Sequence, residues 1–377
     1  MKVLHLNAGN ETGGGMFHIL SLLKELNTDE MVLGVFEQGP MYHEAKQLGI
    51  NVICFEQESR FHLTILKKLS AFIKAEGIDI VHTHGARANL YGFLLKKFAK
   101  CECKWITTIH SDPRDDFLGY GFIGKIYTRL HLFSIKTMDH YFAISTRFKE
   151  MLQHFGIKQS IITTIYNGIN FDTPAFAPIT REQLGLTKKD FVIIMIARLH
   201  PVKGHFIAFR AITNIVQSIP NVHLLVVGDG PMEDELKQSV KKMKISEHVT
   251  FTGYQENIHG YLSMSDLMIL TSHSESFPLV ILEAARAQVP VISTDVGGVK
   301  DLITEPKLGW VIPQKDPIAL EKAMKEAYTL KGEGVLPFIG INLYEKASAE
   351  FSLQQFSDSV YKAYEKIINQ KQVMKST

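Results

Sequence analysis

The sequence predicts two consecutive α/β domains, each a doubly wound parallel sheet covered by helices. Short apolar, β-branched runs alternate with longer stretches of helical period along the chain. The 377 residues leave room for two domains of roughly 100–200 residues each. Hydrophobic residues make up 45% and charged residues 21%, a globular balance that argues against a disordered or fibrous chain.

The first half of the chain carries a series of short, apolar candidate strands. They are Val3–Leu6, Met31–Phe36, Val52–Phe55, Ile80–His82, Trp105–Thr108, Tyr141–Ile144 and Ile161–Ile165. Amphipathic stretches between them, such as Met16–Leu26 and Leu63–Lys74, predict helices. Because strand–helix–strand connections within one sheet are nearly always right-handed, the series predicts a parallel sheet.

The alternation stops at a polar, turn-rich segment, Asn170–Arg181, which Pro174 and Pro178 interrupt. We place the domain boundary there, after residue 170. A second series of strands follows: Phe191–Ala197, His223–Val227, Val249–Thr252, Leu267–Leu270, Val289–Ser293 and Trp310–Ile312. Helical patterns such as His205–Val216 and Ala319–Tyr328 separate them.

The net charge, the cysteines and the lack of long apolar runs argue against several classes of protein. Lys plus Arg (41) against Asp plus Glu (39) leaves a net charge of +2, too small for nucleic-acid binding. Cys54, Cys101 and Cys103 form neither a disulfide framework nor a zinc site, which fits a reducing compartment. The N-terminus resembles no signal peptide, and no apolar run reaches membrane-spanning length. We expect a cytosolic protein, with peripheral membrane contact left open.

A glycine-rich loop follows the first strand. Three consecutive glycines, Gly13–Gly15, precede a helix, so backbone N–H groups and the helix N-terminus could bind an anion. A plain flexible turn is the alternative. The loop lacks the G-x-G-x-x-G spacing, but Glu37 follows the second strand where a ribose-binding acid would stand. An NAD(P)-dependent oxidoreductase therefore remains an alternative.

The G-x-G-x-x-G match at Gly119–Gly124 follows a polar segment and not a strand, so we do not interpret it as a dinucleotide site. The nearby aromatic residues Phe117, Tyr120 and Phe122 either touch acceptor or lipid or belong to a core. Basic residues of Lys96–Lys100 could likewise touch anionic lipid headgroups, although a solvated helix end is the simpler interpretation.

Two cations, Arg198 and Lys203, occupy the loop after the first strand of the second half. A forked guanidinium and a point charge beside a helix N-terminus suit a diphosphate. Two solvated surface cations are the alternative.

Two glutamates bracket the start of a later helix. Glu275 lies in the loop after Leu267–Leu270, and Pro278 sits where a first helical turn tolerates proline. Glu283 lies among apolar residues, where a buried carboxylate needs hydrogen-bond donors such as sugar or ribose hydroxyls. Alternatively, Glu283 pairs with Arg286 on a solvated face.

Together these motifs resemble family 4 of the retaining GT-B glycosyltransferases. They are Arg198 with Lys203-Gly204, Gly228-Asp229-Gly230-Pro231, Glu275 and Glu283 separated by seven residues, and Asp295-Val296-Gly297-Gly298. The resemblance spans nearly the whole chain and implies two Rossmann-like domains facing across a cleft. Asn167-Gly168-Ile169 resembles the family's hinge, and the helix about Leu353–Ile368 resembles the one that returns to the first domain. This gives domains of residues 1–170 with 353–377, and 171–352. Pro278 departs from the glycine that many members carry.

The resemblance also implies roles for residues. Arg198 and Lys203 would clamp the donor diphosphate, Glu275 would bind the transferred sugar, and Glu283 would bind ribose. The nucleotide base would lie near Gly253 and Tyr254. Backbone groups would complete the phosphate cradle at Gly14, Gly15, Phe277, Pro278, Leu279 and Val280.

His110 resembles the family histidine beside the reacting sugar, although alone it would be interpreted as a packed loop histidine. For His82 and His84 we expect structural or acceptor-side roles more than metal binding.

The implied reaction is retaining transfer of a hexosyl group from a nucleotide-diphosphate sugar, most simply a UDP-sugar. The acceptor would be a hydroxyl of a glycan, a lipid-linked molecule or a small molecule, in cell-surface polysaccharide synthesis. Arg198 and Lys203 can neutralise the leaving diphosphate, so we expect no metal or other cofactor. A non-catalytic two-domain sugar-binding protein is a further alternative.

Overall fold

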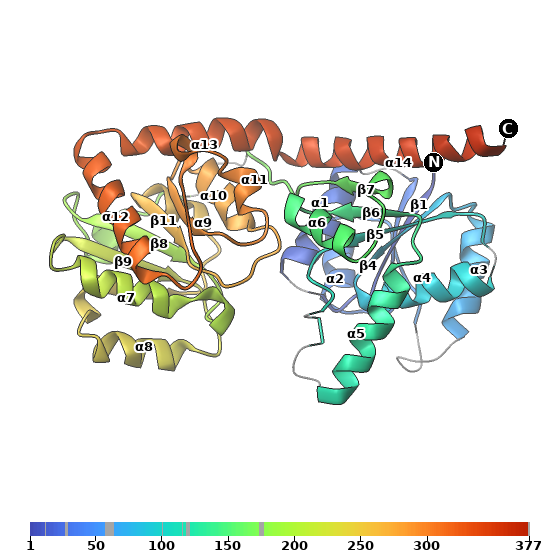
Figure 1. Ribbon diagram of the computed structural model, residues 1–377, viewed down its shortest axis with the longest axis horizontal. Coiled ribbons are helices and arrows are strands. Elements are labelled where there is room, and N and C mark those ends of the chain that lie inside the picture. The colour runs from blue at the N-terminus through green and yellow to red at the C-terminus, as the bar shows by residue number, and fades with distance from the viewer. Residues whose placement is uncertain are drawn as a thin grey trace. The chain divides into compact units, whose positions relative to one another are not determined.

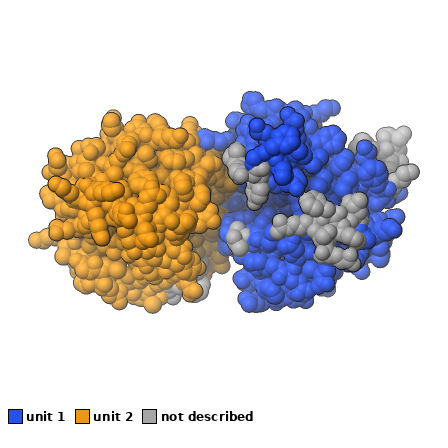
Figure 2. Space-filling view, turned by 90° about the horizontal axis from the view of Figure 1, so that it is seen from below, with its two compact units in different colours: residues 1–168, 353–377 blue, residues 169–352 orange. Residues whose placement is uncertain are grey.

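The computed structural model describes residues 1–11, 13–26, 29–56, 64–99, 101–114, 116–117, 121–172 and 177–375. The chain forms two compact units, coloured separately in Figure 2. Unit 1 comprises Met1–Gly168 and Leu353–Thr377, and unit 2 comprises Ile169–Ser352. Both are parallel sheets with helices, as the sequence predicts (Figure 1).

Unit 1 contains a seven-stranded parallel sheet in the order β3-β2-β1-β4-β5-β6-β7. Its strands are β1 (Val3–Asn7), β2 (Met31–Val35), β3 (Val52–Cys54), β4 (Ile80–His84), β5 (Lys104–Ile109), β6 (His140–Ala143) and β7 (Ile162–Thr164). The chain order reverses between the neighbours β1 and β4, so their carboxyl ends mark the position where such sheets bind ligands.

The helices of unit 1 include the last helix of the chain. They are α1 (Gly14–Leu26), α2 (Pro40–Gln47), α3 (Thr64–Ala75), α4 (Ala86–Phe98), α5 (Gly121–Ile135), α6 (Thr146–His154), α14 (Leu353–Lys375) and a 3₁₀ turn (Gln159–Ile161). Helix α14 packs beside α1 and contributes Phe356, Val360 and Tyr364 to the core of unit 1. The C-terminal segment therefore completes the first unit.

Unit 2 contains a six-stranded parallel sheet in the order β10-β9-β8-β11-β12-β13. Its strands are β8 (Phe191–Ile196), β9 (Val222–Val227), β10 (Val249–Gly253), β11 (Leu267–Leu270), β12 (Val291–Thr294) and β13 (Trp310–Ile312). Here the chain order reverses between β8 and β11. The loops after these two strands carry Arg198, Lys203 and Glu275.

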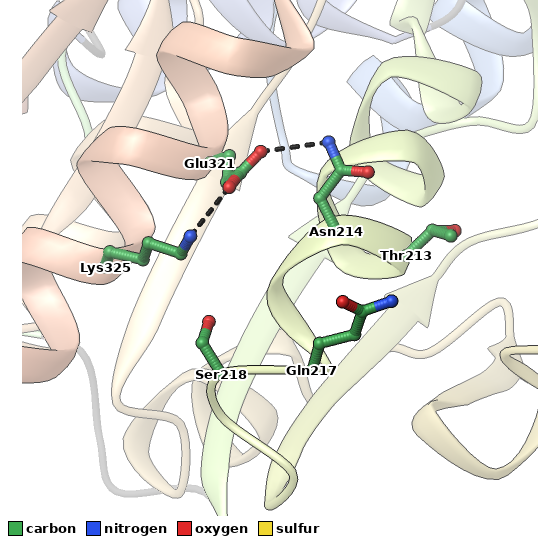
Figure 3. Close-up of a pocket in the computed structure, with 6 residues that line it drawn as sticks. All are labelled: Thr213, Asn214, Gln217, Ser218, Glu321 and Lys325. Carbon is green, nitrogen blue, oxygen red and sulfur yellow. Dashed lines mark hydrogen bonds and ion pairs between the residues drawn. The ribbon is translucent and has the colours of Figure 1, made fainter.

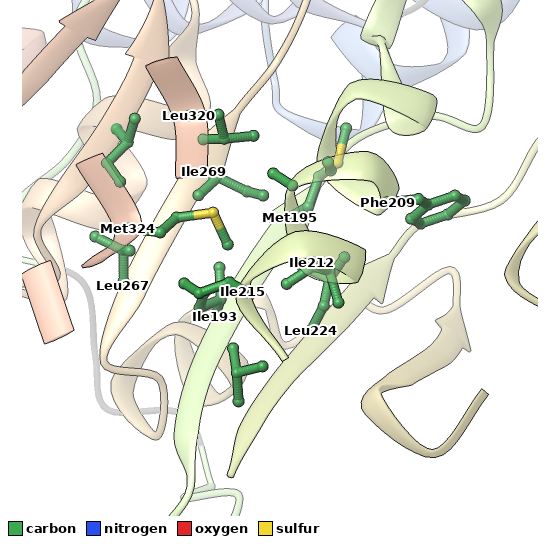
Figure 4. Packing of buried hydrophobic residues seen from close by; sticks show 14 of the residues in the cluster. Ile193, Met195, Phe209, Ile212, Ile215, Leu224, Leu267, Ile269, Leu320 and Met324 are labelled. Carbon is green, nitrogen blue, oxygen red and sulfur yellow. The ribbon is translucent and has the colours of Figure 1, made fainter. Parts of the chain in front are cut away.

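The helices of unit 2 cover the sheet. They are α7 (His205–Ile215), α8 (Glu233–Lys242), α9 (Ile258–Ser263), α10 (Leu279–Arg286), α11 (Val299–Leu302), α12 (Pro317–Gly332) and α13 (Leu336–Glu350). Short 3₁₀ turns are Glu182–Leu184, Pro201–Lys203, Ser246–His248 and Pro306–Leu308. Fully buried side chains such as Ile193, Ile212 and Met324 join β8, α7 and α12 (Figure 4). This core holds the start of α7 at a fixed place on the sheet.

Most strand boundaries differ from the sequence-based expectation by one or two residues, and two of these differences have a clear physical cause. Strand β4 continues to His84, because that residue pairs with Thr108 of β5. Strand β12 starts at Val291, two residues later than predicted, since Pro290 has no N–H to give to a ladder. The predicted helix start at Leu63 lies outside the described residues, and α3 begins at Thr64 in the described part.

Candidate functional site

In unit 2, four loops meet at the carboxyl edge of the sheet. Gly204 has φ +70°, and a Cβ there would lie 2.2 Å from the carbonyl oxygen of Thr271. The Thr271 hydroxyl donates to the Lys203 carbonyl at 3.1 Å, and the His273 N–H donates to the Val202 carbonyl at 2.7 Å. The loop with the two cations is thereby fastened to the loop with Glu275, and only glycine fits at position 204 without strain.

The glycines of the Gly228–Pro231 loop likewise let two backbone segments approach closely, here the loop itself and the segment around Arg198. A Cβ on Gly228 would lie 2.2 Å from the carbonyl oxygen of Ala197, and one on Gly230 would lie 2.6 Å from that of Leu199. The Leu199 N–H donates to the Asp229 carbonyl at 2.7 Å. These contacts hold the backbone on both sides of Arg198.

The side chains of Lys203 and Glu275 form an ion pair. Lys203 Nζ lies 2.6 Å from Glu275 Oε1, and the Ser272 hydroxyl donates to the same oxygen at 2.6 Å. Both side chains are mostly covered, with 23% and 13% of their surface exposed. The pair therefore holds a cation and a carboxylate in fixed positions before any ligand binds.

Arg198, by contrast, is exposed. Among the described residues it has no ion-pair partner. A guanidinium held by a fixed backbone but not neutralised is suited to bind an incoming anion.

Helix α10 starts beside Glu275. Pro278 is its N-cap and does not lie in the first turn as expected, and no side chain caps this end. The Phe277 side chain is buried against Phe351, with ring centroids 5.8 Å apart, which anchors the chain just before the helix. The N–H groups of Leu279 and Val280 lie in the first turn, so the positive end of the helix follows Glu275 by four residues in the chain.

Gly297 brings a fourth loop to this place. Its φ is +48°, and a Cβ would lie 2.3 Å from the Ser276 carbonyl oxygen. The Gly298 N–H donates to the same carbonyl at 3.1 Å. The loop after β12 thus supports the backbone of the segment that carries Glu275.

Glu283 lies within α10 and is half-buried. Burial raises the pKa of its carboxyl, and the positive charge of Arg286 partly offsets that increase. Burial in turn lowers the pKa of Arg286, which donates to the Asn170 carbonyl at 3.2 Å. The alternative of a fully solvated Glu283–Arg286 pair does not fit this burial.

The expected base-binding positions lie at the end of β10. Gly253 has φ +70°, and its carbonyl accepts from the Gly228 N–H at 2.8 Å. The Tyr254 ring is 67% exposed. An exposed aromatic ring there can stack on a planar ligand.

In unit 1, the glycine loop carries a carboxylate that sequence reasoning did not single out. No heavy atom lies within 4 Å of a Cβ built on Gly14, but one built on Gly15 would lie 3.1 Å from Glu11 Oε2. Burial raises the pKa of Glu11, with a smaller contribution from the charge of Asp116. An ionised Glu11 would compete with a phosphate for the N-terminus of α1.

Glu37, the ribose candidate of the oxidoreductase alternative, accepts a hydrogen bond from Arg87 Nη1. The Arg87 guanidinium also lies over the Phe36 ring, 5.3 Å from its centroid. The carboxylate is thus engaged by an ion pair within unit 1.

His110 stands at the end of a buried chain of hydrogen-bonded groups. Its Nε2 lies 3.0 Å from His84 Nδ1, and His84 Nε2 lies 3.0 Å from His5 Nδ1. His5 Nε2 contacts the Tyr364 hydroxyl at 3.2 Å. That hydroxyl also contacts His82 Nδ1 at 2.5 Å.

The chain ends where His82 Nε2 meets the Thr108 hydroxyl at 2.7 Å. Four imidazoles and two hydroxyls are thus joined by five hydrogen bonds. When the imidazoles are neutral, each of the six groups has one proton to donate. All five bonds can then be satisfied with one proton to spare. Protonating an inner imidazole makes both of its ring nitrogens donors, so the groups on one side of it would have to reverse their donor and acceptor roles.

The environment favours this neutral state. Burial is the main cause that lowers the pKa of His5 to about 3 and that of His18 to about 4. Burial also lowers the pKa values of His82, His84 and His110 well below the ordinary value, with neighbouring imidazoles adding to the effect. The sequence singled out His82, His84 and His110 but missed His5, His18 and Tyr364. The register pair His5↔His82 on neighbouring strands was the available signal.

Within the described part of the chain, one trio could geometrically hold a metal ion. Ligand atoms of His5, His82 and His84 lie within 4.8 Å of one another. However, all six of their ring nitrogens already have the hydrogen-bond partners named above. The geometry therefore fits a structural network better than a metal centre.

A cavity of about 420 Å³ adjoins this network in unit 1. Glu11, Asn89, His110, Asp116 and His131 contribute polar groups to its wall, and Phe117 contributes an aromatic ring. The described residues that line it include no lysine or arginine. Carboxylates, amides and an aromatic ring suit the hydroxyls and apolar face of a sugar better than an anion. Gly119 and Tyr120 lie outside the described residues.

A hollow of about 460 Å³ in unit 2 lies apart from the cation loop. It is lined by Thr213, Asn214, Gln217, Ser218, Glu321 and Lys325 (Figure 3). Glu321 accepts from both Asn214 and Lys325, so its charges are neutralised within the wall. The hollow lies at the C-terminal end of α7, whereas Arg198 and Lys203 precede the N-terminal end. It is therefore not part of the candidate site.

Two Rossmann-like units, with cations, a paired glutamate and a helix N-terminus at a carboxyl sheet edge, define the class of GT-B glycosyltransferases. Residues 12–173 match the family Glycosyltransferase Family 4, and residues 177–334 match Glycosyl transferases group 1. The chain belongs to family 4 of the GT-B glycosyltransferases, and the protein is a glycosyltransferase.

Two characterised relatives align with most of the chain. The N-acetyl-alpha-D-glucosaminyl L-malate synthase of Bacillus anthracis is 29% identical over 329 residues, covering 86% of this chain and 83% of its own. The UDP-Gal:alpha-D-GlcNAc-diphosphoundecaprenol alpha-1,3-galactosyltransferase of Escherichia coli is 25% identical over 316 residues, covering 79% and 78%.

Among solved structures, Alr3699/HepE of Anabaena in complex with UDP superposes with a TM-score of 0.84. It is 22% identical, and the match covers 97% of this chain and 100% of that one. The same Anabaena protein in complex with UDP-glucose superposes with a TM-score of 0.79. These likenesses show the same fold.

Proposed function

We propose that the protein transfers a hexosyl group from a UDP-sugar to a sugar hydroxyl, with retention of configuration and without a metal ion. The observation that carries this proposal is the arrangement around Lys203. A fixed Lys203–Glu275 pair, an unneutralised Arg198 and the N-terminus of α10 share one edge of the unit 2 sheet.

The cations act on the leaving group. As the bond from the anomeric carbon to the diphosphate breaks, negative charge builds on the departing oxygen. Arg198, Lys203 and the N–H groups that open α10 stabilise this charge from fixed positions, and more strongly in the transition state than in the bound donor. Arg198, Lys203 and the start of α10 offer positive groups for this task, which supports a reaction without a divalent ion.

The glutamates bind hydroxyls. A sugar hydroxyl can donate to Glu275, whose carboxylate Ser272 and Lys203 already orient. Glu283 can accept from ribose hydroxyls, which would compensate the burial that now raises its pKa. We infer that the base stacks near Tyr254, beside Gly253.

Uridine as the nucleotide is supported by the neighbours. The Anabaena structures are complexes with UDP and UDP-glucose, and the Escherichia coli relative is named for UDP-Gal. We therefore propose UDP as the nucleotide of this protein's donor, without naming the hexose.

For the acceptor we infer an uncharged sugar residue. Among the described residues, the cavity beside His110 is lined by Glu11 and Asp116 and by no lysine or arginine, which disfavours a dicarboxylate such as malate, which the name of the Bacillus anthracis relative mentions. The Escherichia coli relative is named for a lipid-linked sugar acceptor. We propose a glycan or lipid-linked sugar, in cell-surface polysaccharide synthesis at the inner face of the membrane.

Retention has no nucleophile to support it in the cavity wall. Of the two carboxylates there, Asp116 is engaged by the Ser111 hydroxyl and by His131, and Glu11 interacts with Asn7. Retention therefore rests on the family resemblance, and the anomeric configuration of the product is the measurement that decides it.

Calorimetry with UDP tests the donor side. Wild type should bind UDP without added metal and in the presence of EDTA, and Arg198→Ala should weaken binding at least tenfold, about one charge-assisted contact. Lys237→Ala, which removes an exposed lysine paired with Glu233 on α8, is the matched control and should bind as wild type. Binding of NADH in place of UDP would overturn the proposal in favour of an oxidoreductase.

Release of UDP from UDP-glucose, UDP-galactose and UDP-GlcNAc, measured without an acceptor, identifies the hexose. With a sugar acceptor, proton NMR of the product should show the α configuration of the donor. A β-linked product would refute retention while leaving the donor site intact.

A further inference from the structure

One helix of unit 1 exposes an unusually apolar face. Eleven large apolar side chains are strongly exposed in the described part of the chain, and five of them lie on α5: Phe122, Ile123, Ile126, Leu130 and Phe133. The exposed fractions reach 78% at Phe122 and 56% at Phe133. Scattered exposed apolar residues need no explanation, but such a concentration on one helix does.

The spacing of these residues places them on one side of α5. At 3.6 residues per turn, Phe122, Ile126 and Phe133 lie within roughly 40° of one another around the axis. The opposite side carries the buried residues Gly124 and His131. The apolar stripe therefore faces away from the core of unit 1.

Helix α4 extends the apolar face. The two helices pack together, and Phe93 of α4 meets Phe133 with ring centroids 5.2 Å apart. Phe98, the last residue of α4, is 69% exposed. Both helices are labelled in unit 1 of Figure 1.

The charges around this face have one sign. Lys97, Lys125 and Arg129 are exposed, and neither α4 nor α5 contains an aspartate or glutamate. Two carboxylates that follow or precede these helices in the chain are engaged in ion pairs: Asp116 contacts His131 at 3.1 Å, and Asp139 contacts Lys96 at 2.5 Å. On ideal helix geometry, Lys125 and Arg129 flank the apolar stripe within about one fifth of a turn.

We propose that this face docks on an anionic lipid bilayer. We call it the α4–α5 face, meaning Phe98, Phe122, Ile126, Leu130 and Phe133 with Lys97, Lys125 and Arg129. Apolar side chains enter the headgroup boundary while the cations bind lipid phosphates, as in an interfacial amphipathic helix. A second copy of the chain is a poorer occupant, since pairing this face with itself would bring like charges together.

The helix lies on the bilayer and does not cross it. Helix α5 spans Gly121–Ile135, shorter than the ~20 apolar residues that a transmembrane helix needs. Within the described residues, no helix is both long and apolar enough to cross a membrane. The docking deepens the proposed function by naming the surface that would meet a lipid-linked acceptor, but it does not depend on the reaction.

Vesicle flotation tests the proposal. Full-length protein should float with vesicles of phosphatidylcholine and phosphatidylglycerol (7:3) and stay unbound with phosphatidylcholine alone. Lys125→Glu with Arg129→Glu should lower the partition coefficient by more than the ~25-fold expected for neutralising two charges at about fivefold each. Phe98→Ser with Phe122→Ser should lower it at least tenfold, since two large apolar contacts are lost.

The matched control is Ile318→Ser with Phe338→Ser in unit 2, where the exposed fractions are 72% and 61%. It should bind vesicles as wild type. Each variant should keep the thermal midpoint and the UDP affinity of wild type. These two measurements distinguish a loss of vesicle binding from misfolding or from a damaged donor site. Equal flotation of all variants, or altered oligomeric state by light scattering without altered flotation, would overturn the proposal.

Discussion

Unit 1 and unit 2 build their carboxyl sheet edges from different chemistry. At the edge of unit 2, Arg198 is exposed and Lys203 is held against Glu275 at 2.6 Å. At the edge of unit 1, His5 and His84 are nearly inaccessible to solvent, and burial depresses their pKa values. The unit 2 edge carries charged side chains in fixed positions, whereas the unit 1 edge carries buried, neutral polar groups.

This difference supports the proposal that the two units serve different halves of the transfer reaction. A leaving diphosphate needs positive charge that is already in place, which only the unit 2 edge provides. The cavity of unit 1, with Glu11 and Asp116 in its wall, repels an anion and suits a hydroxyl-bearing sugar. Under this proposal, similar folds serve opposite ligands because their loops differ in charge and burial.

The largest expected effect is a loss of folding stability in unit 1 at acidic pH. Histidines whose pKa is lowered in the folded state bind protons only after unfolding, so stability falls as the pH drops from about 6.5 toward the folded values near 3 to 4. Each such histidine costs up to about 1.4 kcal/mol per pH unit. Five such histidines of unit 1 lie together, four of them in the hydrogen-bonded network and the fifth, His18, packed against His110, so unit 1 should lose several kcal/mol before unit 2.

The two tryptophans report the units separately. Trp105 is buried in unit 1, and Trp310 lies in unit 2, so Trp310→Phe and Trp105→Phe variants give one reporter each. The thermal midpoint seen by Trp105 should fall more steeply between pH 7 and pH 5. Unit 2 also has a buried histidine, His205, with a pKa lowered to about 4, and its midpoint should fall less. A Trp105 midpoint that is flat over this range would contradict the neutral network.

Lys203→Ala should reduce kcat by roughly 10²–10³, the usual loss for one fixed contact to a developing charge. The fold should survive, because Thr271 binds the backbone carbonyl of residue 203 and not its side chain. Steady-state release of UDP in the presence of acceptor is the measurement. Turnover within threefold of wild type would remove Lys203 from the mechanism.

Gly204→Ala tests the tight loop packing of unit 2 against the open loop of unit 1. A left-handed φ and a Cβ placed 2.2 Å from the Thr271 carbonyl should cost about 2–4 kcal/mol of unfolding free energy. Gly14→Ala is the matched change in unit 1, where no atom lies within 4 Å, and should alter stability by less than about 1 kcal/mol. Urea unfolding of both variants measures the contrast, and equal losses would show that the two loops are packed alike.

Glu283→Gln should give the smallest changes: weaker donor binding and a slightly more stable fold. Donor Kd should rise about tenfold, as a charged hydrogen bond to ribose is lost. Because burial raises the pKa of Glu283, its ionisation destabilises the folded state, so the Gln variant should gain up to about 1 kcal/mol at pH 7. The gain should shrink once the pH falls below the folded pKa and be gone below the ordinary value of 4.5. A less stable variant at pH 7 would mean that the pairing with Arg286 outweighs burial.

Much of the fold was predictable because the signal was local. Runs such as Phe191–Ile196 and Leu267–Leu270 are apolar and short, as buried parallel strands must be, and the sequence located both. The cations and glutamates of unit 2 were found for a related reason: each follows such a strand, and strand ends mark ligand sites in these sheets. Strand limits were less certain, as at His84, since a ladder partner decides where pairing stops.

The unit 1 network escaped sequence reasoning because its members are far apart in the chain. His5 and Tyr364 are separated by 359 positions, and no spacing rule connects them. Glu11 was likewise not distinguished from an ordinary loop residue. Only the folded chain brings it beside Gly15 and Asp116 and raises its pKa.

By itself, the sequence determined the two parallel sheets and the charged residues at their loop positions, because hydrophobic period and strand-end chemistry are local properties. The tertiary structure decided which charges are neutralised and which are not: Lys203 paired, Arg198 free among the described residues, and the imidazoles from β1, β4 and the β5 end kept neutral. The physical reason is that pairing and desolvation depend on neighbours in space, and those neighbours are set by packing and not by position in the chain.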